Sequence, residues 1–256
     1  MSTESYSKIN QLLSIAPLGV VLSSAWLVNQ GYSLDLQKRY KKSKWFKSFG
    51  RGALIRNEDT VDYLGGIQAL QNQLGLSVHP AAKTALTLQG KSHYLEFSTQ
   101  KVQLFSASSE ILPTWFKNYD WGVKVESNAS SFLPPDIGMV EYQHKSFAIK
   151  VSSPVRAIME CLYLAPKEQT LLEVFELIEG LNNIHPVTAQ KLLESCSSVK
   201  VKRLFLYMAE KAGHEWLTYI NQDKIDLGKG KRQIVSGGVY IHQYQITIPK
   251  ELEKHI

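Results

Sequence analysis

One N-terminal segment constrains the fold of this 256-residue chain more than any other. Between residues 7 and 56, three short helical patterns are followed directly by two extended patterns around a Gly-Arg-Gly turn. Two helices joined by a short turn that contains glycine are typical of a helix-turn-helix. The hairpin predicted immediately after the third helical pattern, which is the second helix of this motif, adds a wing. The order and spacing of the parts therefore predict a winged helix-turn-helix.

Capping and turn residues set the bounds of the predicted helices. Ser7 is suited to cap the first helix, and Ser23 or Ser24 the second, because a hydroxyl oxygen accepts from free N–H groups of a first turn. Gly31 supplies the left-handed residue that ends the second helix, and Ser33 caps the third. The helices are expected over about 8–15, 25–30 and 34–45.

The third predicted helix has two unlike sides. At 100° per residue, Leu36 and Tyr40 fall on one face, with Ser43 beside them. The opposite side is expected to face water, and it carries Gln37, Lys38, Lys41 and Lys42. Ammonium groups bind phosphates or guanine edges, and a Gln side chain can pair with adenine. This helix is therefore predicted to enter the major groove of DNA.

The predicted wing consists of strands over 45–49 and 53–56 that flank Gly50-Arg51-Gly52. Both glycines can take the positive φ values that a tight turn needs. An arginine at the tip can enter the minor groove or hold a phosphate.

Positive charge is concentrated in the same segment. The formal net charge is +6, and residues 1–97 carry 11 basic against 6 acidic residues, while residues 98–256 carry 18 against 17. Eight cations and no acid lie between residues 38 and 56, which makes a field that attracts phosphates. A merely solvated helix face is the alternative interpretation. The candidate DNA-binding residues are Ser33, Gln37, Lys38, Lys41, Lys42, Lys44, Lys47, Arg51 and Arg56.

The remaining patterns predict an α+β chain of two domains. Residues 1–97 form the DNA-binding domain, completed by a helix over 61–75 and short strands in the pieces HP, TALTLQG and HYLEF. Residues 98–256 form a mixed α/β domain. Its expected strands are KVQLFSA, GVKVES and SFAIKVSS. The aromatic segment PTWFKNYDW is expected to lie over the sheet, and a glycine-rich turn followed by strands is expected at the C-terminal end. Its expected helices span 153–165, 169–181, 185–196 and 200–220, the first with Pro154 in its first turn.

Catalytic motifs are lacking. The loop Gly228-Lys229-Gly230-Lys231-Arg232 resembles a phosphate cradle, yet it lacks the GxxxxGK[ST] spacing. Two cysteines and seven scattered histidines indicate no metal site, and no nucleophile elbow occurs. We expect no enzymatic activity, no cofactor and no metal. A nucleotide-binding protein or enzyme using loop 228–232 stays the alternative, and a pure protein-interaction scaffold is a third possibility.

The chain shows no pattern for a membrane or for export. It has no apolar run of 18 residues, and its N-terminal apolar stretch is interrupted by Ser14, Pro17 and Gly19. A cytoplasmic protein without membrane association is expected.

Several segments together resemble one family. Six segments, taken in order, are similar to the AbiEi-type antitoxins of type IV (abortive-infection) toxin–antitoxin pairs. They are LSSAWLVNQGYS, RYKKSKWFKSFGRGALIR, YLGGIQALQNQLGLSVHPAAKTALTLQGKSHYL, SSPVRAIMECL, VKVKRLFLYMAE and LGKGKRQIV. The likeness runs from about residue 7 to 250. It implies an autorepressor that binds inverted repeats in operator DNA, with two protomers as a possible dimer on DNA. It also implies a C-terminal domain that counters a cognate nucleotidyltransferase-like toxin.

The resemblance provides no residue list for toxin antagonism. We therefore take the conspicuous basic positions of the second half as candidates for that surface. They are Lys200, Lys202, Arg203, Lys229, Lys231 and Arg232.

Overall fold

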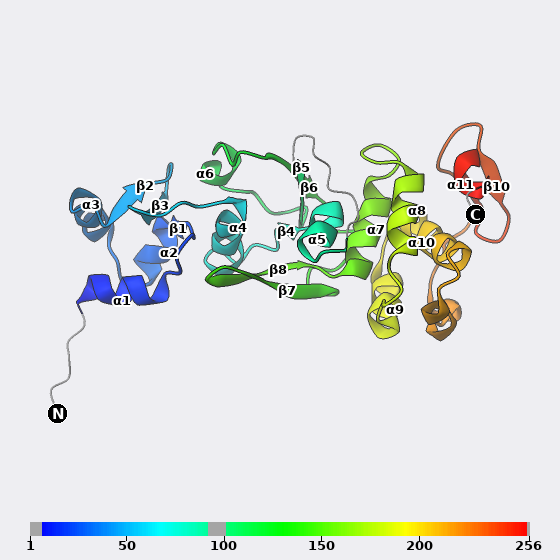
Figure 1. The fold of residues 1–256 in the computed structure, drawn as a ribbon, viewed down its shortest axis with the longest axis horizontal. Helices are drawn as coiled ribbons and strands as arrows, with labels where there is room; N and C mark the ends of the chain where they lie inside the picture. Colours follow the sequence, from blue (N-terminus) through cyan, green and yellow to red (C-terminus); the bar gives the residue numbers. More distant parts are fainter. Residues whose placement is uncertain (1–6, 92–100, 255–256) are drawn as a thin grey trace, which may run out of the picture. The chain divides into compact units, whose positions relative to one another are not determined.

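The structure, a computed structural model, describes residues 7–91 and 101–254 (Figure 1). Two compact units divide these residues. The first unit comprises the described residues of Met1–His79, Ser109–Lys124 and Glu141–Lys150. The second comprises those of Pro80–Ser108, Val125–Val140 and Val151–Ile256. Each unit thus gathers separate stretches of the chain.

Three helices open the first unit: α1 (Lys8–Ile15), α2 (Ser24–Asn29) and α3 (Leu34–Lys42). The predicted caps of α1 and α3 are present, since Ser7 accepts from the N–H of Asn10 and Ser33 from that of Leu36. Gly31 turns the chain between α2 and α3 with φ of +86°. Helix α3 ends three residues earlier than predicted.

A three-stranded antiparallel sheet completes the motif, with β3 (Ala53–Arg56) between β1 (Leu22–Ser23) and β2 (Phe46–Ser48). Gly50 and Gly52 both have positive φ in the turn between β2 and β3, as predicted. Buried apolar residues join the helices to the sheet, among them Leu12, Leu27 and Phe46. The N-terminal domain is a winged helix-turn-helix, as predicted, with β1 as an additional strand.

Two further helices belong to the first unit. Helix α4 (Tyr63–Asn72) is capped by Asp62, whose carboxylate accepts from the N–H of Gly65 at 3.1 Å. The short helix α6 (Thr114–Lys117) comes from the predicted aromatic segment. In the structure this segment packs against Phe49, next to the wing, and against α4 at Gly66.

Five strands lie in the middle of the chain, four of them six residues long. Strands β4 (His79–Pro80), β5 (Lys101–Ser106) and β6 (Lys124–Ala129) form one sheet in that order. Strands β7 (Met139–His144) and β8 (Phe147–Ser152) pair with each other. The predictions for β5, β6 and β8 are confirmed, whereas β7 was not anticipated.

Helices form the core of the second unit. They are α5 (Ala82–Leu88), α7 (Pro154–Leu164), α8 (Leu171–Glu179), α9 (Pro186–Ser195) and α10 (Val199–Lys211). Helix α7 contacts the other four and is buried along most of its length, and Figure 1 shows α8 and α10 beside it. Pro154 occupies the first turn of α7, as predicted. No described helix is long and apolar enough to cross a membrane.

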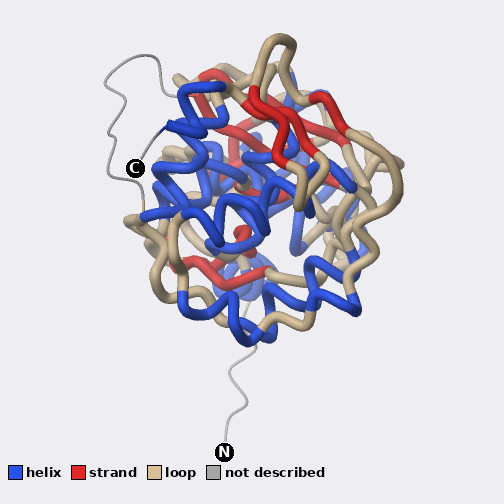
Figure 2. The backbone as a smooth tube through the Cα atoms, turned by 90° about the vertical axis from the view of Figure 1, so that its right-hand side faces the viewer, coloured by secondary structure: helices blue, strands red, loops and turns tan. Residues whose placement is uncertain are grey.

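The C-terminal part consists of short elements. Two 3-10 turns, η1 (Glu215–Tyr219) and η2 (Gln222–Lys224), precede a sheet in which β11 (Ile246–Ile248) lies antiparallel to β10 (Val239–Ile241) and parallel to β9 (Arg232–Gln233). Helix α11 (Lys250–Lys254) follows. Figure 2 colours all helices blue and all strands red along the described trace.

One predicted strand is wrong. The piece TALTLQG belongs to helix α5. Its apparent alternation conceals a helical spacing, because Ala82, Ala85 and Leu86 are all fully buried. The neighbouring piece HYLEF lies outside the described residues.

Candidate nucleic-acid interface

Helix α3 exposes a row of cations. Lys38, Lys41 and Lys42 are exposed, as predicted. Lys38 forms one exposed ion pair, with Asp35 at 3.1 Å. Because exposed pairs contribute little to stability, this contact leaves the lysine available to exchange partners.

Gln37 does not face water, so the prediction for this residue is wrong. It is 4% exposed, and its Nε2 donates to the main-chain oxygens of Tyr32 at 2.8 Å and Ser24 at 3.1 Å. Both carbonyls belong to the segment that contains α2 and its C-terminal turn. A buried amide needs partners, and here the carbonyl oxygens at the start of α2 and just before α3 supply them. Gln37 therefore joins the two helices of the motif.

Arg39 is the residue that the sequence analysis missed. It lies about 200° around α3 from Gln37, which places it on the outward face, and it is exposed. Leu36 and Tyr40, on the flanks of the inward face, are only half-buried. The sequence analysis took the inward face to be centred between Leu36 and Tyr40. Centring it on Gln37 instead would have predicted that Arg39 faces outward.

The wing and the turn before it add three exposed cations: Lys44, Lys47 and Arg51. Arg51 lies at the tip between two glycines, as predicted. Helix α3 contacts β2, so the wing follows the helix in space as well as in sequence. Ser33 is exposed at the start of α3, where its hydroxyl caps the helix.

Arg56 has a structural role that the sequence did not suggest. Its side chain is half-buried, and Nη2 donates to the main-chain oxygens of Leu13 and Ala16. These carbonyls belong to the last turn of α1, where intrahelical partners are absent. The prediction that Arg56 contacts DNA is therefore replaced by a contact that holds α1 on β3.

An aromatic cluster anchors the wing within the first unit. We call Phe49, Trp115, Phe116, Tyr119 and Trp121 the wing-root cluster. The ring of Phe49 lies 4.1 Å from that of Tyr119, 5.6 Å from that of Trp121 and 6.3 Å from that of Trp115, measured between centroids. The indole Nε1 of Trp121 donates to the oxygen of Phe116 at 2.9 Å. Packed aromatic pairs of this kind give the hairpin a rigid base.

The cations of α10 do not form a surface, so three of the C-terminal predictions are wrong. Lys202 and Arg203 are 4% and 2% exposed. The Nζ of Lys200 donates to the oxygens of Tyr163 and Ala165, and burial together with nearby Lys167 lowers the pKa of its ammonium group. Helix α10 packs on α7 and α8, and Lys200 and Arg203 donate to carbonyl groups there.

Arg203 organises the glycine-rich loop from inside. Its guanidinium donates to the main-chain oxygens of Leu227, Gly228, Gly230 and Gln245 at 2.7–3.2 Å. The exposed side of this loop carries Lys229, Lys231 and Arg232. Lys231 lies over the ring of Tyr240, with Nζ 5.1 Å from its centroid. The loop thus presents three cations from a fixed backbone.

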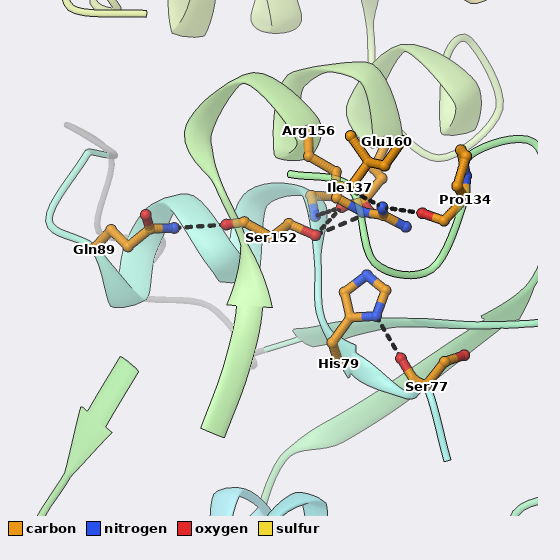
Figure 3. Close-up of polar contacts among 9 residues, drawn as sticks. Ser77, His79, Gln89, Pro134, Ile137, Ser152, Arg156 and Glu160 are labelled. Atoms are coloured by element: carbon orange, nitrogen blue, oxygen red, sulfur yellow. Dashed lines mark hydrogen bonds and ion pairs between the residues drawn. The ribbon is translucent and has the colours of Figure 1, made fainter. Parts of the chain in front are cut away.

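A buried charged network in the second unit looks like a possible reactive site but serves the fold. Figure 3 shows Arg156 and Glu160 of α7 pointing toward each other, with Nε and a carboxylate oxygen 2.8 Å apart. Ser152 of β8 and the N–H of Ala82 also donate to Glu160. Arg156 further donates to the carbonyl oxygens of Pro134 and Ile137 at 2.6 Å. The network joins β8, α7 and α5.

Other reactive groups are also inward. Burial raises the pKa of the Cys161 thiol to about 12 and raises that of Cys196 as well, so neither is an activated nucleophile. Among the described residues, no three His, Cys, Asp or Glu side chains gather as metal ligands would. The exposed cations are therefore the chemical feature that most needs a partner.

Comparison with known families accounts for both parts of the chain. Residues 5–97 match the family described as "Transcriptional regulator, AbiEi antitoxin N-terminal domain", and residues 99–249 match "Transcriptional regulator, AbiEi antitoxin, Type IV TA system". The fold is similar to that of the RV2827C protein from Mycobacterium tuberculosis, with a TM-score of 0.56 and 12% identity over 94% of this chain and 89% of that chain. No curated protein matches the sequence.

Proposed function

Because the chain belongs to the AbiEi antitoxin family of type IV toxin–antitoxin transcriptional regulators, we propose that it represses its own operon by binding inverted repeats through its winged helix-turn-helix. Its C-terminal domain counters a nucleotidyltransferase-like toxin. We place the division of these two tasks near residue 97. The matched ranges, 5–97 and 99–249, support that division along the sequence, whereas the compact units place residues 109–124 and 141–150 with the winged helix-turn-helix.

The observation that carries the DNA-binding proposal is the exposure of α3 and the wing. Seven cations between residues 38 and 51 are exposed: Lys38, Arg39, Lys41, Lys42, Lys44, Lys47 and Arg51. No acidic residue lies within that stretch. A helix of this kind followed by a hairpin supplies phosphate contacts from both elements and base contacts from the helix. An inverted repeat then takes one protomer on each half-site.

Arg39 is our candidate for reading bases. An arginine on the outward face of a recognition helix can donate two hydrogen bonds to the O6 and N7 atoms of guanine. Replacing Arg39 with alanine should reduce discrimination at one base pair by about 1–3 kcal/mol. The lysines are expected to contact phosphates, because an ammonium group is a point charge without a fixed fork of donors.

A titration of promoter DNA at several salt concentrations tests the proposal. Neutralising about six phosphates per protomer should give a slope near −5 for log affinity against log salt. The double variant K38A/K41A should weaken binding to all sequences, whereas R39A should mainly change the preferred sequence. The matched control K167A/K191A removes two exposed lysines of the second unit. Salt-independent binding, or equal losses in both double variants, would contradict the proposal.

The C-terminal candidates reduce to the loop organised by Arg203. Lys229, Lys231 and Arg232 are exposed on one short stretch, which suits an acidic surface of a protein partner. We therefore propose this loop as the surface for toxin antagonism. Isothermal calorimetry with nucleoside triphosphates distinguishes it from a nucleotide site, because tight Mg²⁺-dependent binding would favour the latter.

A further inference from the structure

A groove of about 490 Å³ lies beside the wing, entirely within the first unit. One wall consists of β2 and the turn at Gly50 and Arg51. The other consists of α6 and the residues just after it. The groove thus joins a proposed DNA-binding element to a segment some 60 residues further along the chain, which the sequence analysis did not connect with DNA.

The groove has the chemistry of a site for an anion with a sugar attached. Lys47 and Arg51 supply positive charge, and no acidic residue lines the groove. On the opposite wall Thr114 and Asn118 are exposed and can donate hydrogen bonds through a hydroxyl and an amide. Tyr119 is 42% exposed and offers part of a ring as well as a hydroxyl group.

The two walls of the groove are held together. Trp115, only 5% exposed, packs on the wing, and a Cβ added at Gly50 would meet the Cβ of Trp115 at 3.2 Å. The rings of Phe49 and Tyr119 make the further contact described above. The backbone segments that carry the donors are therefore held at a fixed separation, which lowers the entropy cost of binding.

We propose that this groove binds the sugar–phosphate backbone of the operator next to the wing, with Thr114 and Asn118 as DNA contacts from outside the helix-turn-helix. The inference rests on the proposed DNA binding and extends its footprint. DNA is the occupant because Lys47 and Arg51 belong both to the groove and to the proposed DNA-facing wing. Side-chain hydroxyls and amides commonly contact phosphate and sugar in protein–DNA interfaces.

The test places one negative charge in the groove of the full-length chain. In T114E the glutamate stands at the first residue of α6, where an acidic side chain favours the helix, so the fold should tolerate it. Operator affinity should fall about tenfold or more, since a phosphate then meets a carboxylate in place of a donor. The matched control T60E introduces the same charge at an exposed threonine of the same unit that does not line the groove. Its affinity should stay within about twofold of the wild type, because solvent screens a charge that does not touch the DNA.

Two other outcomes distinguish a failure of the groove proposal from a failure of the proposed DNA binding. Unchanged affinity of T114E together with a large loss in K38A/K41A would overturn the groove and leave the proposed DNA binding intact. Unchanged affinity in all these variants would overturn both.

A second measurement places the change in the DNA instead of adding a charge to the protein. Wild-type protein is titrated with operator DNA in which the phosphates beside the wing are replaced by neutral methylphosphonates. We expect the wild type to lose affinity severalfold and the variant T114A/N118A to lose markedly less. Equal losses in both proteins would overturn the proposed contacts.

Discussion

Lys44 ends helix α3 in a backbone conformation that favours glycine. Its φ is +58°, the N–H of Lys44 donates to the oxygen of Lys41, and that of Trp45 donates to the oxygen of Tyr40 at 3.0 Å. This pair of bonds defines a Schellman-type helix end, whose left-handed residue is usually glycine. A lysine at that position costs about 1 kcal/mol relative to glycine. The chain thus keeps a cation next to the proposed DNA face at the expense of stability.

The variant K44G should raise the free energy of unfolding by about 0.5–1 kcal/mol, because it relieves the left-handed strain. Urea denaturation measures the change. The control K41G makes the same chemical replacement inside α3 and should lower the free energy of unfolding by about 1 kcal/mol. Operator affinity should fall in both variants, since each loses a cation. A K44G variant less stable than the wild type would contradict this account of the helix end.

At the scale of elements, capping groups link α4 to its surroundings. The carboxylate of Asp62 accepts from the N–H of Gly65 and from His144 and Lys145, with the His144 contact at 2.8 Å. Burial alone would raise the pKa of Asp62, but the bonds from His144, Gly65 and Lys145 outweigh it and hold the pKa below its ordinary value. A carboxyl group whose pKa is lower in the folded state stabilises the fold at any pH above its pKa in the unfolded state. This contribution disappears as the pH falls through the pKa of the folded state.

The variant D62N should therefore be less stable than the wild type at pH 7, by about 1 kcal/mol for the weakened cap and lost ion pairs. The difference should shrink as the pH falls from about 5 to about 3, across the ordinary aspartate pKa of about 3.9. Thermal unfolding followed by circular dichroism at a series of pH values measures this. A difference that stays constant over that range would show that the ionised carboxylate is not the stabilising group.

The buried network of α7 gives the second element-scale prediction. The variant E160A leaves the guanidinium of Arg156 in the core without its carboxylate, and breaking such a pair costs about 3–5 kcal/mol. The double variant R156M/E160L removes both charges and should lose no more stability than E160A. Urea denaturation of both proteins provides the comparison, and a double variant far less stable than the single one would show that the lost bonds of Arg156 to Pro134 and Ile137 outweigh the uncompensated charge.

Local signals account for the elements that were predicted correctly. Ser7, Ser33, Gly31 and Pro154 act through their immediate neighbours, so their effects can be predicted from the sequence. Strand β1 has only two residues and exists because it pairs with β3, about 30 residues away. Helix α5 was mistaken for a strand because a short run of small and apolar residues fits both periods.

The candidate site could be predicted only in part, since exposure depends on tertiary partners. The cations of α3 and the wing follow from charge and helical phase. Gln37, Arg56 and Arg203 instead turn inward and donate to carbonyl groups of other segments. No sequence pattern predicts the positions of those carbonyl groups. Thr114 and Asn118 were missed because α6 reaches the wing from a distant part of the sequence.

At the scale of the whole molecule, the proposed tasks should be separable by mutation. The triple variant K229A/K231A/R232A changes only exposed side chains, so its stability should stay within about 0.5 kcal/mol of the wild type. It should repress an operator-driven reporter normally and fail to protect cells that express the toxin. Full protection by the triple variant would show that the surface for toxin antagonism is not the loop at residues 229–232.

R203A serves as the structural comparison for that experiment. It removes the donor to four carbonyl oxygens, three of them at residues 227–230, and should destabilise the second unit, by about 1–3 kcal/mol for each buried group left without a partner. Its loss of antagonism would accompany a lower melting temperature, whereas that of the triple variant would not.

The inward amide of Gln37 has a consequence for how a repressor of the proposed kind can change its target. Because Gln37 sets the alignment of α2 with α3, the scaffold of the motif and its contact residues are different side chains. Under the proposed mode of binding, exchanges at Lys38, Arg39 and Lys42 would alter the side chains that meet a promoter and leave the angle between the two helices unchanged. New operator preferences can therefore arise through single outward substitutions, without any redesign of the domain that carries them.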